Sequence, residues 1–319
     1  MLNLFLYVGA ALIWGSTWLA IKLQLAQVPP ILSVSYRFCL AALILLAYCR
    51  FSGRRLKFSL RDHGFMMLQG FTLFGLSYCG SYMATAYMTS GLVAVVFSTI
   101  LMMNIFNLRI FLGQPIAWRA FYGGMVGLTG ICVVFWHDLT AFSATSGLVG
   151  LLIAIFGAYM ASVGNVVGTR HAKAGVPVTQ ANAFGMAYGG VLTLIIHFSL
   201  GGTLTMDWSV GYLGPMLYLT LFGSIVAFGC YMLLIGRVGA EYAAYVTLLM
   251  PLIALILSSL FEGYRWTANA SAGVALVLAG NLIILTPRKT LRSALNKLKA
   301  QPFQIRAPGF PGSRNYHPD

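Results

Sequence analysis

The tetrapeptide TLFG occurs at residues 72–75 and again at residues 220–223, so the second copy lies 148 residues after the first in a chain of 319. Leucine matches are frequent in a hydrophobic sequence, but matches of rarer residues at one fixed offset are not. The same offset pairs Val28-Pro29 with Val176-Pro177, Gly91 with Gly239, Thr99 with Thr247 and Trp118 with Trp266. The sequence therefore predicts a duplicated unit.

Composition indicates the solvent in which this unit folds. Hydrophobic residues make up 59% of the chain and charged residues 8%, with a mean hydropathy of +0.83, whereas soluble domains carry about 25% charged residues. So few charges cannot cover a water-facing surface, and we predict an integral membrane protein. The net charge of +14 comes from bases between and after hydrophobic stretches, which favours anionic lipid headgroups over nucleic acid as partners.

The hydrophobic stretches are separated by short segments that carry turn or charge signals, such as QVPP at 27–30 and GGTLTMDW at 201–208. A helix needs about 20 apolar residues to cross the hydrocarbon core. The expected spans are roughly 4–24, 31–49, 65–85, 91–112, 120–137, 147–169, 178–200, 211–235, 242–261 and 268–286. We therefore predict an all-α integral membrane protein with ten transmembrane helices.

The basic residues orient these spans, because Lys and Arg collect in cytoplasmic loops. With a cytoplasmic N-terminus, only Lys22, Arg37 and Arg265 of the 20 basic residues fall toward the outer side. Both termini are then cytoplasmic. Each repeat holds five spans, an odd number, so the second repeat crosses the membrane in the opposite direction. Such inverted-topology repeats are characteristic of secondary transporters, which expose one central site to either side in turn.

Three segments follow from this pattern. Residues 1–137 are expected to form the first five-helix repeat, 147–286 the second, and 287–319 a basic cytoplasmic tail. The tail first alternates bases with leucines, as in a helix that lies on the inner leaflet. Its end is rich in Pro and Gly, and we expect the tail to be partly disordered.

Polar residues beside aromatic ones mark one face of two equivalent spans. In the third span Tyr78 and Tyr82 share a helix face with Gly75, and in the eighth span Ser224 and Tyr231 share a face. A pocket for a small organic solute needs apolar walls with a few placed hydroxyl or amide groups. The two tyrosines of the third span, with Ser224 and Tyr231, are therefore candidates for a substrate cavity. The alternative is helix packing, with the tyrosine hydroxyls bonded to a neighbouring helix.

Four further residues are candidates for the same cavity. Asn104 and Asn165 are amides within spans and need polar partners inside the bundle, either on a neighbouring helix or on a substrate. Trp14 lies in the middle of a span, which suits a cavity wall as well as an anchor. Pro251 leaves a carbonyl on the preceding turn free, either in a packing kink or toward the cavity.

The charges within the spans restrict the substrate. Lys22 and Arg37 fit an outer anchor or gate contact, near enough to the surface to snorkel, and a carboxylate-binding role is the alternative for Arg37. No Asp or Glu falls in the middle of a span, so a buried carboxylate for a proton relay or for a bulky cationic drug is missing. Neutral or zwitterionic metabolites fit better.

Several motifs resemble the EamA-like family of the drug/metabolite transporter superfamily. They are ALIWGSTWLAIK at 11–22, SVSYRFCLAALILL at 33–46, ASVGNVVGTRHA at 161–172, and the paired patterns FLGQPIAW and LFEGYRW at span ends. The resemblance covers about residues 4–286. It implies ten helices, a central cavity between two halves, and export of small metabolites, often amino acids, in the bacterial inner membrane. Met103 and Gln114 depart from the family pattern in the first copy, whereas Pro251 and Glu262 keep it in the second.

The expected function is therefore a secondary transporter that exports a small neutral or zwitterionic metabolite, most simply an amino acid or a related compound. A facilitative channel and a non-transporting scaffold or sensor are the alternatives. An intramembrane enzyme does not fit, because the spans hold no nucleophile with a base and no metal-ligand spacing. We predict no cofactor and no metal, and the sequence leaves the oligomeric state open.

Overall fold

The computed structural model describes residues 1–24, 28–84, 87, 93, 96–134, 136, 146–261 and 266–285. The chain divides into two units, Met1–Ile284 and Leu285–Asp319. All features considered below belong to the first unit, because the expected tail at 287–319 lies outside the described residues. Throughout the described part of the first unit, the regular elements are helices, as the sequence predicts.

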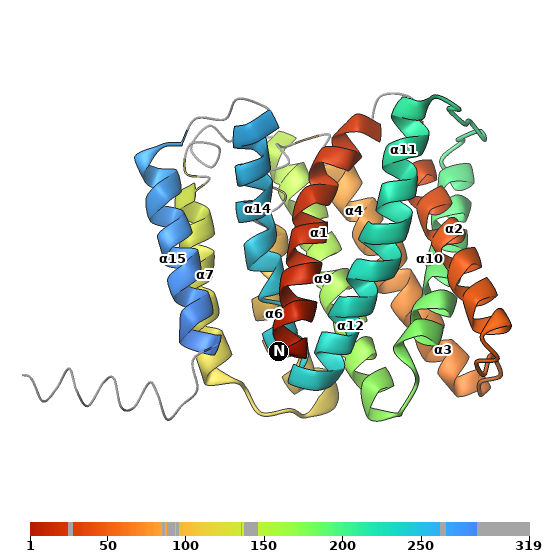
Figure 1. Ribbon diagram of the computed structural model, residues 1–319, viewed down its shortest axis with the longest axis horizontal. Coiled ribbons are helices and arrows are strands. Elements are labelled where there is room, and N and C mark those ends of the chain that lie inside the picture. Colours follow the sequence, from red (N-terminus) through yellow and green to blue (C-terminus); the bar gives the residue numbers. More distant parts are fainter. Residues whose placement is uncertain are drawn as a thin grey trace, which may run out of the picture. The chain divides into compact units, whose positions relative to one another are not determined.

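The helices follow one another with short connections (Figure 1). The first part of the chain forms α1 (Leu2–Gln24), α2 (Pro30–Phe51), α3 (Leu60–Gln69), η1 (Gly70–Leu76), α4 (Ser77–Ala84), α6 (Ile100–Leu112) and α7 (Trp118–Val134). The second part forms α9 (Ser146–Lys173), α10 (Val178–Ser199), α11 (Val210–Tyr218), η2 (Leu219–Val226), α12 (Ala227–Val238), α13 (Ala240–Ala243), α14 (Val246–Phe261) and α15 (Ala268–Leu285). Their bounds lie close to those expected from the hydrophobic pattern, except that α6 begins at Ile100 and not at residue 91; residues 88–92 and 94–95 lie outside the described part.

Local sequence signals set several of these bounds. The α2 helix begins with Pro30 in its first turn, where a missing N–H is tolerated. The α3 helix begins after Ser59, whose Oγ accepts a hydrogen bond from the Asp62 N–H. The α6 helix ends at Gly113, which has a φ of +64° and therefore adopts the left-handed conformation that glycine favours.

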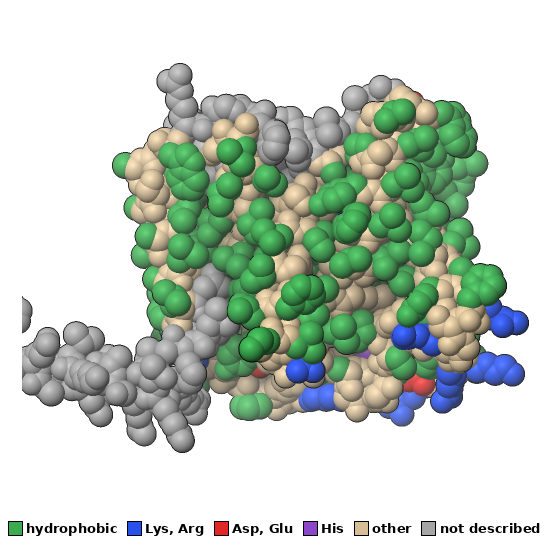
Figure 2. Space-filling model, viewed as in Figure 1, with side chains coloured by type: hydrophobic (Ala, Val, Ile, Leu, Met, Phe, Trp, Pro, Cys, Tyr) green, Lys and Arg blue, Asp and Glu red, His purple; other side chains and the backbone are tan. Residues whose placement is uncertain are grey.

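The outer surface of the helices has the character of a membrane protein. Among the described helices, four are long and apolar enough to cross a membrane: Pro30–Phe51, Gly147–Lys173, Val178–Ser199 and Val210–Val238. Figure 2 shows a broad hydrophobic band, with Lys and Arg side chains gathered along the edge at which Figure 1 marks the N-terminus. Exposed bases from the end of α2 to the start of α3 are Arg50, Arg54, Arg55, Lys57 and Arg61. We call the edge that carries these bases the basic edge. The hydrophobic band and the long apolar helices are those of a multi-pass membrane protein.

Both copies of TLFG lie in π-helical segments rather than in regular α-helix. In η1 the Ser77 N–H donates to the Thr72 carbonyl, and in η2 the Ala227 N–H donates to the Phe222 carbonyl, so each bond spans five residues. The π-helix is rare and frequently occurs at functional sites. The same motif therefore adopts the same uncommon backbone conformation in the two parts of the chain.

The side chains of the two motifs differ in their surroundings. Thr72 Oγ1 donates to the Leu68 carbonyl at 2.7 Å, whereas Thr220 Oγ1 is buried without a hydrogen-bond partner in the described part of the chain. Phe74 is fully buried, but Phe222 is 47% exposed. The backbone shape is thus shared, and the packing around it is not.

Small residues allow close helix contacts, as expected where lipid supplies no hydrophobic drive for helix association. Gly70 of η1 lies against the Gly185 carbonyl of α10, and Gly130 of α7 lies against α15, where an added Cβ would be 2.7 Å from the Gly273 carbonyl. Gly75, in the first TLFG motif, also packs against α10: an added Cβ would lie 3.0 Å from the Leu192 side chain and 3.7 Å from the Gly189 carbonyl.

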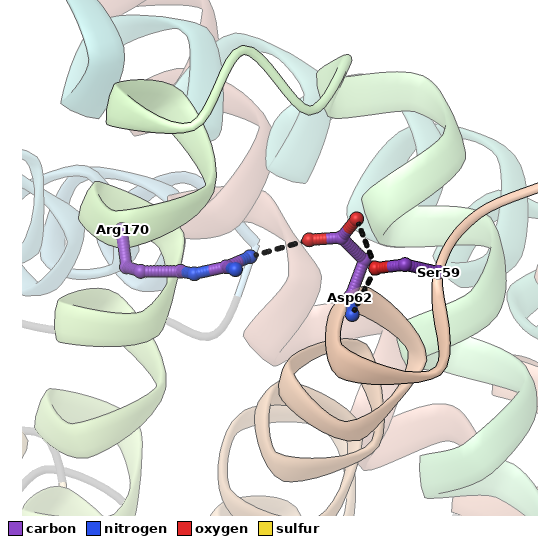
Figure 3. A network of polar contacts seen from close by, with 3 residues as sticks. All are labelled: Ser59, Asp62 and Arg170. Carbon is purple, nitrogen blue, oxygen red and sulfur yellow. Dashed lines mark hydrogen bonds and ion pairs between the residues drawn. The ribbon is translucent and has the colours of Figure 1, made fainter.

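A polar contact at the basic edge joins α3 to α9 (Figure 3). Arg170 Nη1 donates to Asp62 Oδ1 at 3.0 Å, and Ser59 Oγ donates to Asp62 Oδ2 at 2.8 Å. The hydrogen bond from Ser59, followed by the one from Arg170, lowers the pKa of the Asp62 carboxyl. The Arg170 guanidinium also lies over the Phe65 ring, 4.0 Å from its centroid.

This contact makes stability depend on pH in a defined direction. Because folding lowers the Asp62 pKa, the ionised carboxylate stabilises the protein above its ordinary pKa of about 4, and the contribution is lost as pH falls through the folded-state pKa. We expect Asp62→Asn to lower the melting temperature of the detergent-solubilised protein at pH 7, with a difference from wild type that shrinks below about pH 4. Thermal unfolding between pH 7 and pH 3 measures this, and a difference that grows toward acid would contradict it.

Candidate substrate cavity

A cavity of about 120 Å³ lies among side chains of α1, α2, α4, α9, α12 and α14. One water needs a cavity of roughly 10–15 Å³. The cavity is several times larger, so it has room for a small organic solute. Its lining combines aromatic and aliphatic side chains with hydroxyls, one amide and one guanidinium. Of the sequence-predicted residues, Trp14, Arg37, Tyr78, Tyr82, Asn165, Tyr231 and Pro251 line it.

One wall of the cavity is aromatic. The Trp14 ring contacts Phe228 edge-on, with centroids 4.8 Å apart, and lies 5.0 Å from the Tyr231 ring. Tyr78 meets Phe38 edge-on at 4.8 Å. Edge-on and tilted contacts of this kind hold rings in fixed orientations, so the wall is a rigid surface for an apolar group.

The π-helical segment η2 fixes the position of the Trp14 indole. In an α-helix the Ala227 N–H would donate to the Gly223 carbonyl, but in η2 it donates to the Phe222 carbonyl. Trp14 Nε1 donates to the Gly223 carbonyl at 3.0 Å. The second TLFG motif thus presents a backbone acceptor to α1, and this bond orients the central ring of the aromatic wall.

Arg37 is buried beside the cavity, with only 2% of its surface exposed. Its Nε donates to Ser224 Oγ at 2.7 Å, and Ser224 Oγ in turn donates to the Leu219 carbonyl at 3.1 Å. Arg37 Nη1 has no hydrogen-bond partner among the described residues. The expectation of an outer anchor that snorkels to the surface is therefore wrong, because α2 turns this side chain inward between α4 and η2.

Lys22 was expected to share the outer position with Arg37, but its side chain lies outside the described part of the structure. Ser224 does not line the cavity. It supports Arg37 from behind, so its place near the cavity is indirect.

Two asparagines form a chain of amides next to the cavity. Asn104 Nδ2 donates to the Ala240 carbonyl at 3.2 Å, and Asn165 Nδ2 donates to Asn104 Oδ1 at 3.4 Å and to the Tyr231 hydroxyl at 3.1 Å. The Ala240 carbonyl sets the orientation of the first amide and thereby that of the second. Asn104 is fully buried behind the lining, whereas Asn165 lines the cavity and its Oδ1 has no partner within the described residues.

Four cavity hydroxyls escaped the sequence analysis: Thr17, Ser77, Ser81 and Thr247. Ser77 and Ser81 lie four residues apart and each precedes a candidate tyrosine, so they occupy one face of the same helix. The helical spacing of Ser77 and Ser81 could therefore have identified both as cavity residues. Thr17 lies three residues after Trp14, the next turn of the same face.

Gly223 gives Arg37 room to reach Ser224. An added Cβ there would lie 2.9 Å from Arg37 Nη2 and 2.9 Å from Thr17 Cγ2. We expect Gly223→Ala to destabilise the protein by about 1–3 kcal/mol through overpacking. Gly229→Ala is the matched control, because nothing lies within 4 Å of its added Cβ and alanine favours helix. Melting temperatures of the two variants check this, and equal values would contradict the close approach at Gly223.

A bundle of apolar helices around a cavity with polar groups defines a class, the multi-helical membrane protein with an internal cavity. The sequence profile of the EamA-like transporter family matches residues 1–136 and again residues 148–286. The chain belongs to this family and is a membrane transporter. The family resemblance drawn from the sequence is confirmed.

Related proteins carry consistent descriptions. The chain is 30% identical to the uncharacterized inner membrane transporter YedA of Escherichia coli over 84% of this chain and 87% of that protein. It is 26% identical to the uncharacterized transporter YvbV of Bacillus subtilis, over 91% and 94% of the two chains. One crystal structure, whose title names no function, shares the fold with a TM-score of 0.76. The two chains are 18% identical, and the match covers 92% of this chain and 98% of that one.

Proposed function

We propose that this protein is a secondary transporter that moves a small neutral or zwitterionic metabolite, an amino acid or a related compound, out of the cell across the bacterial inner membrane. The observation that carries the proposal is the cavity, which both parts of the chain line with rigid aromatic rings and a few hydroxyl and amide groups. Sites of this composition suit small organic solutes.

The proposed architecture consists of ten transmembrane helices in two inverted five-helix repeats, 1–137 and 147–286, with both termini cytoplasmic. The family profile that matches twice and the π-helical segment at each TLFG motif support the duplication. The basic edge supports the orientation, because bases collect on the cytoplasmic side and there contact anionic headgroups.

Alternating access follows from this architecture. Two related halves that cross the membrane in opposite directions have two similar packing solutions, one open to each side. The cavity lies where helices of both halves meet, since α1, α2 and α4 line it together with α9, α12 and α14. A rearrangement of one half against the other would open the same residues to the opposite side.

The lining also disfavours cationic drugs. Among the described lining residues, Arg37 is charged and none is Asp or Glu, so a cation would enter without a counter-ion and beside a like charge. Desolvating an unpaired charge in a membrane interior is costly. Neutral compounds and zwitterions avoid most of this cost.

Transport by purified protein in proteoliposomes tests the proposal. We expect saturable flux of at least one compound from a panel of amino acids and related metabolites, and about a tenfold loss in Tyr78→Ala, because one aromatic contact and one hydroxyl are removed from the lining. Tyr122→Ala is the matched control, since Tyr122 is 61% exposed on α7. Flux that rises without saturation would favour a facilitative channel, and absence of flux across the panel would favour a scaffold or sensor.

A further inference from the structure

We propose that Arg37 binds a carboxylate group of the transported molecule, so that the substrate class is small carboxylates with an apolar body seated on the aromatic wall. This rests on the proposed transport function and names the chemistry of its site. Four observations support it: the fixed position of the guanidinium, its unused donor, the charge of the cavity, and the wall beside it.

The guanidinium is held in place by the protein and still has a donor to spare. The bond from Nε to Ser224 Oγ fixes one edge of the group, and the Tyr78 ring lies 5.2 Å from its central carbon. The Tyr78 and Tyr82 side chains also hydrogen-bond Arg37, whereas its Nη1 is buried and has no partner among the described residues. A buried donor without a partner carries a desolvation penalty that a bound acceptor removes.

Arginine suits a carboxylate better than other acceptors of this size. Its planar group presents parallel N–H donors that match the two carboxylate oxygens, and such charge-assisted bonds are stronger than neutral ones. A lysine at this position would offer only a point charge.

The net charge of the site points in the same direction. Because the described lining contains Arg37 but no acidic residue, the empty site carries one positive charge. A single carboxylate neutralises that charge inside the membrane, where an uncompensated one is expensive. A zwitterion pairs its carboxylate with Arg37 in the same way, but its ammonium group leaves the site with a net charge of +1; its apolar part would lie against Trp14 and Phe228.

Ligand binding to the detergent-solubilised full-length protein tests this inference independently of transport. Thermal stabilisation is measured with the standard amino acids, with 4-methylpentanoate, and with 4-methylpentanamide, the uncharged amide of the same carbon skeleton. We expect carboxylates to stabilise the wild-type protein and 4-methylpentanamide to bind at least about tenfold more weakly than 4-methylpentanoate. Inorganic phosphate is included as the rival anion, and stabilisation by phosphate but by no carboxylate would overturn the inference.

Two variants at the same position separate binding chemistry from folding. We expect Arg37→Gln to weaken carboxylate binding by at least about 30-fold, the lower end of the cost of removing one partner of a buried charge pair, and to leave binding of the uncharged 4-methylpentanamide unchanged. Arg37→Lys is expected to fall between Gln and wild type. Arg109→Gln, which removes an exposed base on α6, is the matched control and is expected to bind like wild type.

Contrary outcomes identify which idea fails. Carboxylate binding that is equal in wild type and Arg37→Gln, or 4-methylpentanamide that binds as tightly as 4-methylpentanoate, would overturn the role of Arg37. If such a protein still carries saturable flux in proteoliposomes, the transport function stands and only the substrate class is wrong. If carboxylates bind in detergent but no compound shows flux, the carboxylate site stands and the transport function fails.

Discussion

The hydrogen bond from Arg37 Nε to Ser224 Oγ joins α2 to η2 inside the bundle, and much of the surrounding structure depends on it. A guanidinium within an apolar helix must find polar partners in the protein, because lipid offers none. Ser224 can accept this bond because its own hydrogen points to the Leu219 carbonyl. Gly223, directly before it, has no side chain that would displace Arg37 or Thr17. A charge that the membrane disfavours is thus held at a fixed place beside the cavity.

The π-helical segment explains why this region can serve two helices at once. A bond pattern that spans five residues leaves the Gly223 carbonyl for Trp14 Nε1, while the next residue receives Arg37. Adjacent residues of η2 therefore position one ring of the aromatic wall and the one charge known in the lining. The η1 segment has the same backbone conformation, but it packs against α10 through Gly70, and its residue among the described cavity lining is Leu73. The two segments thus share a backbone shape, and their surroundings differ.

The sequence predicted the helices well because their bounds depend on local signals. Long apolar stretches, Pro30 at the start of α2 and Gly113 at the end of α6 act within a few residues of the bound that they set. The sequence also pointed to Tyr78, Tyr82 and Asn165, which line the cavity. Helical spacing and the cost of a polar group in lipid can each be judged from a single helix.

Features that depend on neighbouring helices could not be predicted in this way. Counting along α2 places Arg37 about two turns from the helix end, near enough to snorkel, but the direction of its side chain is set by Ser224 on a distant part of the chain. The same holds for Ser224 and Asn104. Each lies behind the cavity lining because of a contact with another helix, to Arg37 for Ser224 and to the Ala240 carbonyl for Asn104. The π-helical conformation has no composition signal, so TLFG indicated the repeat without indicating the backbone shape.

The central claim is that one cavity between the two halves is reached from each side of the membrane in turn. A single cysteine placed at Ser77, in a background with the five native cysteines replaced, tests this with a membrane-impermeant thiol reagent applied to right-side-out and to inside-out vesicles. Our account predicts modification from both sides, slowed in each case by a transported compound. Modification from one side only, under all substrate conditions, would contradict alternating access at this cavity.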